Sequence, residues 1–235
     1  TPDIAYHNNK FSRGNDMLVD ILGADHHGYI NRMKAAMQTL GYNKDALNID
    51  IIQMVRLIKN GEEVKMSKRT GNAIALRELI EEIGVDAARY NFVSRAADTH
   101  LDFDLGLAVA QTNENPVYYI EYANARICSI LRNYNQKVDK IDKYTHLKTE
   151  EVYNILNKLI EFPDVVISAS KKQEPHQIAN YVYDLATLFH SFYAKEKIIT
   201  DNELETIEKL NLLLAIQTII QNALNLLGII PREEM

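Results

Sequence analysis

Cationic and hydroxyl side chains gather between two glycines in the stretch GEEVKMSKRTGN, Gly61 to Asn72. Glycine permits backbone conformations that other residues resist, so such a segment can fold over a ligand. Lys65, Ser67 and Lys68 can donate hydrogen bonds to phosphate oxygens, and each charge-assisted bond contributes roughly 1.5–3 kcal/mol. The stretch therefore fits a loop that binds a polyphosphate. Composition alone favours the alternative interpretation, a solvated basic hairpin tip.

A second polar stretch runs from Gly23 to Gly28 and contains Asp25, His26 and His27. A closed zinc site needs three or four convergent ligands, and no cysteine or glutamate is suitably spaced here, so we expect no bound structural metal. The histidines can instead donate to phosphate or ribose, and Asp25 can accept from ribose hydroxyls. The alternative is that Asp25 only caps the helix that follows.

Both polar stretches follow predicted strands. The apolar run Met17 to Leu22 predicts a buried strand of a parallel sheet, and Asn48 to Ile58 is again β-rich. Between them, one helical face carries apolar residues and ends at a capping glycine: Ile30, Met33, Ala36, Met37, Leu40 and Gly41. In such sheets the ligand lies beyond the carboxyl ends of the strands, so we expect both stretches at one rim.

The next segment predicts further short elements. Ala75 to Ile83 is amphipathic and ends at Gly84, after which Asp86 is predicted to cap a helix that runs through Arg95. Leu101 to Leu105 alternates like a short strand, in which Asp102 and Asp104 are predicted to bind backbone amides or arginines. A change of composition follows at residues 112–116, where Asn115 can cap a helix and Pro116 can occupy its first turn.

From Pro116 onward the pattern predicts helices only, joined by short polar connections, as in a helical bundle. The first helix carries the stripe Ile120, Ala123, Ile127, Ile130, Leu131 and Tyr134. Thr149 is predicted to cap a second helix, Pro163 to Lys172 to form a third, Pro175 to open a fourth, and Asn202 to Leu227 to form a last one closed by Gly228. The predicted fold is α/β followed by all-α, with domains at residues 1–112 and 113–235.

The first of these helices begins with Tyr118, Tyr119, Tyr122 and Arg126. Tyrosines at helical spacing usually pack in a core, but those left exposed beside an arginine can stack on unpaired bases. The single cysteine, Cys128, falls within the apolar stripe, so we expect it to pack in the core.

Composition limits the classes of protein further. The chain has 235 residues, a net charge of −6 and one cysteine, which excludes an internal disulfide. No signal peptide is visible, which favours a cytoplasmic protein. The uncharged stretch Leu210 to Pro231 contains several Asn and Gln residues, so we expect a buried helix rather than a membrane span. Because the sequence opens at Thr1 without an initiator methionine, we expect it to be a fragment.

Several motifs together resemble one family. These are DIAYH, KFSRGND, GADHHGYI, QMV, GEEVKMSKRTGN, LRELIEEIGVDAARY, HLDFDL, NENPVYYIEYANARICSIL and LGIIPREEM. In this order they are similar to bacterial arginyl-tRNA synthetase, and they cover nearly the whole chain. KMSK alone indicates only the class I synthetases, whereas HLDFDL and NENPVYY single out arginine among them.

The resemblance implies a partial Rossmann-type catalytic domain joined to an anticodon-binding bundle of the DALR type. In this family arginine attacks the α-phosphate of ATP, which is bound with Mg²⁺, and the arginyl group then passes to the tRNA. Lys65 and Lys68 would neutralise the phosphates, Ser67 would bond an oxygen and Met66 would pack the closed loop. Residues of the ATP site would be Gly23, Asp25, His26 and Gln53, together with Lys65 and Lys68.

The remaining expected sites follow from the same resemblance. Asp3 matches the carboxylate that binds the substrate guanidinium, for which a planar, bidentate partner is suited. The run that meets the anticodon loop would include Asn115, Tyr118, Tyr119, Ala125, Arg126 and Met235. The HIGH motif is missing, so we expect an arginine–tRNA ligase fragment that is inactive alone, with tRNA(Arg), ATP and L-arginine as partners and neither DNA nor a membrane. The alternative is a tRNA-binding or assembly module without catalysis.

Overall fold

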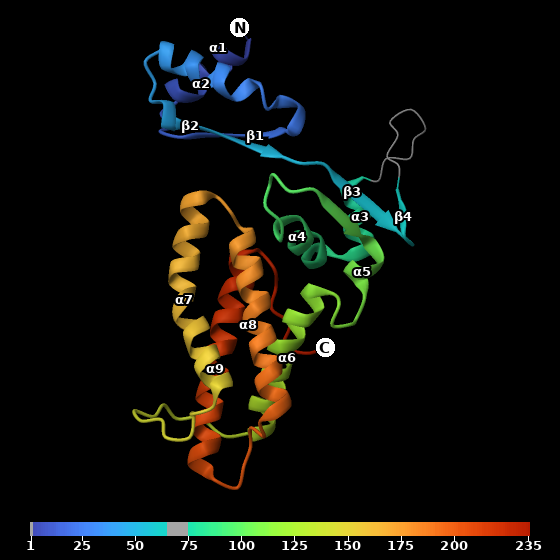
Figure 1. The fold of residues 1–235 in the computed structure, drawn as a ribbon, viewed down its shortest axis with the longest axis vertical. Coiled ribbons are helices and arrows are strands. Elements are labelled where there is room, and N and C mark those ends of the chain that lie inside the picture. Colours follow the sequence, from blue (N-terminus) through green and yellow to red (C-terminus); the bar gives the residue numbers. More distant parts are fainter. Residues whose placement is uncertain (1, 65–74) are drawn as a thin grey trace. The chain divides into compact units, whose positions relative to one another are not determined.

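The computed structural model describes residues 2–64 and 75–235, and its chain divides into two compact units. The first unit comprises residues 1–56 and 97–102, and the second comprises residues 57–96 and 103–235. Figure 1 shows the order of their helices and strands along the chain. The domain boundary near residue 113 stays a prediction.

The first unit contains a two-stranded parallel sheet and two helices. Its elements are α1 (Pro2–Ser12), β1 (Leu18–Gly23), the 3-10 turn η1 (Ala24–His26), α2 (Tyr29–Thr39), η2 (Lys44–Ala46) and β2 (Leu47–Ile52). The strands pair in register from Leu18 with Leu47 to Gly23 with Ile52. One core forms between sheet and helices from Phe11, Leu18, Met33, Met37, Leu47 and Ile49. The predicted strand–helix–strand order, the parallel pairing and Gly41 after the end of α2 (φ +92°) are confirmed.

One expectation for this unit is wrong, and one of its helices has no matching prediction. Strand β1 is buried on one face only, because side chains alternate along a strand and the face with Val19 and Ile21 is exposed. Helix α1 was not predicted, although Pro2 at its start and the apolar or buried positions Ile4, His7 and Phe11 are a helical signal.

The β-rich run after α2 forms two strands rather than one. Strand β2 ends at Ile52 and β3 (Val55–Lys59) belongs to a second sheet of order β4-β3-β5, with β4 (Glu62–Glu63) and β5 (Leu101–Asp104). Asn60 and Gly61 both have positive φ, as the tight turn of the β3–β4 hairpin requires.

The two aspartates of β5 do what the sequence predicted. Asp102 accepts two hydrogen bonds of 2.7 Å from the guanidinium of Arg56, and Asp104 accepts one of 3.1 Å from the amide of Leu107. The second of these caps the short helix α5 (Leu105–Val109).

Helices α3 (Leu76–Ile83) and α4 (Val85–Val93) meet at Gly84, whose φ is +84°. The cap of α4 is Gly84 itself, so the prediction that Asp86 caps this helix is wrong. Asp86 lies in the first turn, where its carboxylate accepts from the amide of Ile230 at 3.4 Å.

The rest of the second unit is a helical bundle in which α6 to α9 pack side by side (Figure 1). Its helices are α6 (Pro116–Tyr134), α7 (Glu150–Lys172), α8 (His176–Lys195) and α9 (Glu203–Leu226). The predicted starts at Asn115, Thr149, Pro175 and Asn202 are confirmed, as is Gly228 after the last helix, with φ +71°.

The prediction of a separate helix from Pro163 is wrong, because Pro163 lies inside a continuous α7. A proline within a helix costs about 3 kcal/mol through a missing hydrogen bond and a steric clash. Here buried side chains on both sides of it, including Phe162 and Ala169, hold the two halves of α7 against the same core, and this packing outweighs the cost.

Helix α9 occupies the centre of that core, where Leu210, Leu213, Ile216 and Ile220 have no exposed surface. The expectation of a buried helix in this uncharged stretch is confirmed. Within the described part of the chain, no helix is long and apolar enough to cross a membrane. Cys128 is buried as expected, accepts from the amide nitrogen of Gln217 at 2.9 Å, and has a pKa raised by burial.

Candidate nucleic-acid interface

Three residues one helical turn apart form a continuous face on α6. The rings of Tyr118 and Tyr122 stack with centroids 6.1 Å apart and planes 7° from parallel. The guanidinium of Arg126 lies 5.2 Å from the Tyr122 ring centroid and donates a hydrogen bond to the Tyr122 hydroxyl. The spacing i, i+4, i+8 places all three on one side of the helix.

Helix α8 adds two rings to this face. Arg126 also lies 5.2 Å from the ring centroid of Tyr193, and His190 stacks with Tyr122 at 5.7 Å. Nε2 of His190 donates to the carbonyl of Tyr119 at 3.1 Å, and burial lowers the His190 pKa below its ordinary value. We call Tyr118, Tyr122, Arg126, His190 and Tyr193 the aromatic face; all five side chains are partly exposed.

No acidic side chain in the described part of the chain neutralises the charge of Arg126. Among residues 2–64 and 75–235, no carboxylate lies within ion-pair distance of it. A partly exposed cation between aromatic rings suits a chain of unpaired bases, since the rings can stack on bases and the guanidinium can bind phosphate. The same rings also stabilise the contact between α6 and α8, so packing accounts for part of the arrangement.

The other predicted residues of α6 face inward. Asn115 is buried, and its amide donates to the carbonyls of Ala108 and Ala110 while its oxygen accepts from the amide of Val117. Tyr119 packs beside Tyr183 and His190, and Ala125 is buried. In this structure these side chains support the aromatic face from within, and their predicted contact with tRNA stays a prediction.

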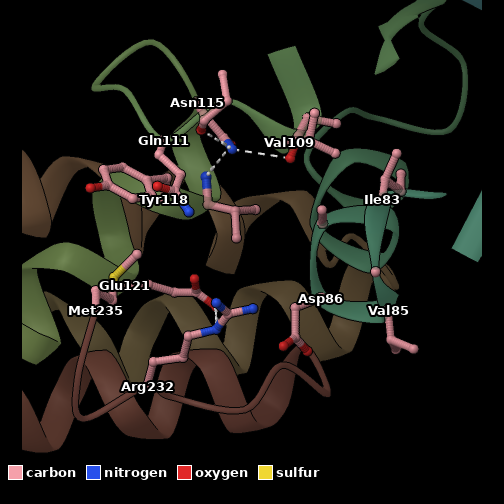
Figure 2. Close-up of a pocket in the computed structure, with 15 residues that line it drawn as sticks. Ile83, Val85, Asp86, Val109, Gln111, Asn115, Tyr118, Glu121, Arg232 and Met235 are labelled. Carbon is pink, nitrogen blue, oxygen red and sulfur yellow. Dashed lines mark hydrogen bonds and ion pairs between the residues drawn. The ribbon is translucent and has the colours of Figure 1, made fainter. Parts of the chain in front are cut away.

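Met235 lines a cavity of about 190 Å³ together with Tyr118, Glu121 and Arg232 (Figure 2). The segment that ends at Met235 is held on α6, because the carbonyl of Arg232 accepts from the amide of Asn124 at 2.7 Å. Met235 therefore lies near Tyr118, the first residue of the aromatic face, and its predicted contact with tRNA stays a prediction.

Glu121 was not identified from the sequence. It is only 3% exposed, and burial raises its pKa to about 7, an effect that Arg232 opposes and Asp86 reinforces. An acidic residue between Ile120 and Tyr122 of a largely buried helix was the available signal.

Four of the predicted nucleotide-binding residues, Gly23, Asp25, His26 and Gln53, belong to the first unit. Since Gly23 pairs with Ile52, the turn with Asp25 and His26 and the residue Gln53 follow the same ends of β1 and β2. Asp25 does not cap α2, whose N-cap is Gly28; its side chain is 82% exposed and lies 3.5 Å from His26 Nε2. A side chain at Gly23 would approach only the mobile end of Asp25, at 2.9 Å, so packing within the chain constrains this glycine little.

Asp3 lies in the first turn of α1 and is exposed. Burial raises the pKa of Tyr29, and the charges of Asp3 and Asp20 add to the effect, so both carboxylates act on the start of α2. Helix α1 and strand β1 are joined by a largely buried pair, His7 and Asp20, that the sequence did not reveal. Nε2 of His7 lies 2.6 Å from Asp20, and Nδ1 of His7 lies 2.7 Å from the carbonyl of Asp3.

The expected phosphate-binding residues Lys65, Met66, Ser67 and Lys68 lie outside the residues that the structure describes. Elsewhere, in residues 2–64 and 75–235, no three or more His, Cys, Asp or Glu side chains are grouped to hold a metal ion.

Comparison with known proteins places this geometry in a family. Residues 120–235 match the DALR anticodon binding domain. The whole chain is 54% identical to "Arginine--tRNA ligase 1" of Halalkalibacterium halodurans, and spans 43% of the length of that protein.

Solved structures agree with the sequence comparison. A structure from Campylobacter jejuni described as an arginyl-tRNA synthetase superposes with a TM-score of 0.86 at 39% identity, covering 99% of this chain and 51% of that one. The Thermus thermophilus arginyl-tRNA synthetase has a TM-score of 0.76 at 20% identity over 94% of this chain and 41% of its own, and shows the fold alone. The predicted fold class, class I synthetase α/β structure followed by a helical bundle, is thus confirmed. The chain belongs to the arginyl-tRNA synthetase family.

Proposed function

We propose that these residues are the part of an arginine–tRNA ligase that binds the anticodon region of tRNA(Arg) and contributes the KMSK loop to ATP-dependent activation of arginine. The observation that carries the RNA-binding half is the aromatic face, in which Arg126 lies between the Tyr122 and Tyr193 rings without an acidic partner among the described residues. The match to the DALR domain and the similarity to arginine–tRNA ligases support the same proposal.

We assign the nucleotide site to residues of the first unit and of the GEEVKMSKRTGN stretch. Gly23, Asp25, His26 and Gln53 would contact ATP, which binds with Mg²⁺, and Asp3 would pair with the guanidinium of L-arginine. Lys65 and Lys68 would neutralise the phosphates, with Ser67 and Met66 as their neighbours. In the complete ligase, Lys68→Ala should slow adenylate formation by roughly 10²-fold or more, because it removes a charge that stabilises the transition state. Its tRNA affinity should change little.

We propose a catalytic part at residues 1–112, an anticodon-binding part at residues 113–235, and a cytoplasmic place of action in protein synthesis.

The RNA-binding proposal is tested by measuring the affinity of the 235-residue chain for an arginine tRNA transcript and for a tRNA of another amino acid. We expect binding that prefers the arginine tRNA and weakens steeply with salt, since phosphate contacts release counterions. Arg126→Ala should weaken it, whereas Lys171→Ala, which removes an exposed charge from the end of α7, should not. Equal effects of the two variants would contradict the assignment of the face.

A second proposed function, a tRNA-binding or assembly module without catalysis, follows from the motif content of these residues. The tetrapeptide HIGH does not occur in the 235 residues. An ATP–pyrophosphate exchange assay with arginine and tRNA distinguishes the two. We expect no exchange from these residues alone and measurable exchange when they are joined to the remaining length of a relative. Exchange by the 235 residues alone would show that they hold every essential group.

A further inference from the structure

The last segment of the chain, residues 227–235, is fastened along two helices; we call it the strap. On α4, Arg89 donates to the carbonyl of Leu227 at 3.5 Å, and Asp86 accepts from the amide of Ile230 at 3.4 Å. On α6, Asn124 and Arg132 donate to strap carbonyls, at 2.7 Å and 3.4 Å. Leu227 and Ile229 of the strap are buried in the core of the bundle, so these two residues stay in place. The hydrogen bonds of residues 230–235 are few and mostly at the surface, so this outer part of the strap can detach without unfolding the bundle.

Beneath the strap lies the carboxyl group of Glu121, which is not paired as a buried charge should be. Its Oε1 has no hydrogen-bond partner and lies 3.4 Å from Nε of Arg232, at the upper end of ion-pair distances. Figure 2 shows the carboxylate and the guanidinium side by side at the cavity of about 190 Å³, with Asp86 nearby. A buried charge is costly unless it is well paired and fully hydrogen-bonded, so this arrangement favours the neutral acid.

The charged groups that face Glu121 come from two elements. The strap contributes Arg232, which favours the ionised form, and α4 contributes Asp86, which opposes it. Helix α5 has no charged residue, and α9 has none after Lys209. Burial is the largest influence and raises the Glu121 pKa to about 7, so Arg232 compensates for the burial only in part.

We propose that the strap is a proton-sensitive latch, docked while the Glu121 carboxyl group carries its proton and loosened when that group ionises. Arg232 and Met235 both line the cavity above Glu121. Lifting the strap therefore admits water to the carboxylate, which stabilises its charge. The undocked state binds the proton more weakly than the docked state, and by linkage a rise in pH favours undocking.

The size of the effect follows from the two pKa values. The docked value is about 7, and the ordinary value of 4.5 applies once the group is exposed. Between pH 6 and pH 8 these values lower the docking constant by about tenfold.

The latch also bears on RNA binding, and this consequence rests on the proposed function. Met235 and Tyr118 line the same cavity, and Tyr118 is the first ring of the aromatic face. Release of the strap removes Met235 from the wall of the cavity that Tyr118 also lines. We therefore expect affinity for arginine tRNA to fall from pH 6 to pH 8 more in the wild-type chain than in Glu121→Gln, which keeps the shape of the side chain but cannot ionise.

The test of the latch itself uses amide hydrogen exchange of the 235-residue chain without RNA. Protection factors are measured from pH 6 to pH 8 for the strap peptide and for a reference peptide in α7. In the wild type we expect strap protection to fall by about tenfold while α7 protection stays constant. In Glu121→Gln, strap protection should not depend on pH. A pH-independent strap in the wild type, or an unchanged pH dependence in Glu121→Gln, would overturn the proposal.

Two further variants make the test independent of how Glu121→Gln folds. Arg232→Met removes the cation that lowers the Glu121 pKa, so the transition should move to higher pH. Asp86→Asn removes the opposing charge and should move it to lower pH. If the midpoint of the pH transition in strap protection is unchanged in both variants, a group other than Glu121 causes the pH dependence and the proposal is wrong. If exchange behaves as expected but no tRNA binds at any pH, the latch stands and the proposed function fails.

Discussion

The carboxylate of Glu208 accepts a hydrogen bond of 2.7 Å from the backbone amide of His146, and its other oxygen lies 3.0 Å from Nδ1 of the same histidine. Thr145 donates to it as well, through its amide at 2.8 Å and its hydroxyl at 3.0 Å. Glu208 has no exposed surface and lies in the N-terminal part of α9. Through Thr145 and His146 it fixes the connection between α6 and α7 to this part of α9. Burial alone would raise its pKa, but these donors outweigh burial and hold the pKa at about 2.

Glu208→Gln should therefore destabilise the bundle. The glutamine side chain has one acceptor oxygen instead of two, so it cannot accept every hydrogen bond that the carboxylate accepts. Its NH₂ group would also face the donors of Thr145 or His146. We expect a loss of roughly 3 kcal/mol in the free energy of unfolding at pH 7, because hydrogen bonds to charged groups are among the strongest. Urea denaturation followed by circular dichroism measures it. Glu203→Gln, at an exposed position in the first turn of α9, is the control and should change stability by less than about 0.5 kcal/mol.

Acid should reduce the same contribution. The Glu208 pKa is lower in the folded protein than its ordinary value of 4.5, so its stabilisation is complete above pH 4.5 and is lost as pH falls toward 2. Stability curves of the wild type and Glu208→Gln should converge over this interval. Parallel curves would contradict the assignment of the low pKa to Glu208.

The elements that sequence alone predicts are those whose signals are local. Asn115 before Pro116 and Gly228 after α9 mark helix ends because the cap residue and the terminal glycine act within one turn. Pro163 misleads for the complementary reason. Its local cost is real, but it is outweighed by core residues such as Phe162 whose partners lie on other helices.

The candidate sites divide in the same way. Tyr118, Tyr122 and Arg126 share a face by their spacing alone, which the sequence could show. That His190 and Tyr193 complete this face depends on how α8 packs on α6, and no spacing encodes it. The same is true of the buried polar groups, since the partners of Glu121 and His7, which are Arg232 and Asp20, lie on other elements of the chain.

Glu121→Gln should have the opposite effect on stability from Glu208→Gln. Burial raises the Glu121 pKa to about 7 in the folded protein, above its ordinary value of 4.5. The contribution of Glu121 to the stability of the folded protein is therefore complete below pH 4.5 and is lost as the pH rises to 7. Glutamine avoids the ionised state, so at pH 8 the variant should be more stable than the wild type by about 3 kcal/mol at most. At pH 4 the two should unfold at nearly the same urea concentration. A variant that is less stable at pH 8 would show that Arg232 compensates fully for burial.

Gly228 tests the junction between α9 and the strap. An alanine there would take a left-handed conformation at φ +71°, and its Cβ would lie 2.8 Å from Nη1 of Arg89. The backbone conformation alone costs roughly 1–2 kcal/mol, and displacement of Arg89 adds to it. We expect Gly228→Ala to lower stability by more in the wild type than in Arg89→Ala, as a double-mutant cycle measures. Equal losses in both backgrounds would mean that Arg89 moves aside without cost.

Tyr122 distinguishes stacking on RNA from packing within the bundle. Its ring lies between those of Tyr118 and His190, and its hydroxyl accepts from Arg126. Loss of one base-stacking ring costs about 1–3 kcal/mol, so Tyr122→Ala should weaken binding of arginine tRNA by roughly 5- to 150-fold in fluorescence anisotropy. Tyr122→Phe keeps the ring and should retain most of the affinity, and Tyr153→Ala, at an exposed tyrosine of α7, should retain all of it. If Tyr122→Ala lowers the unfolding temperature but leaves the affinity of the folded fraction unchanged, the ring serves only the contact between α6 and α8.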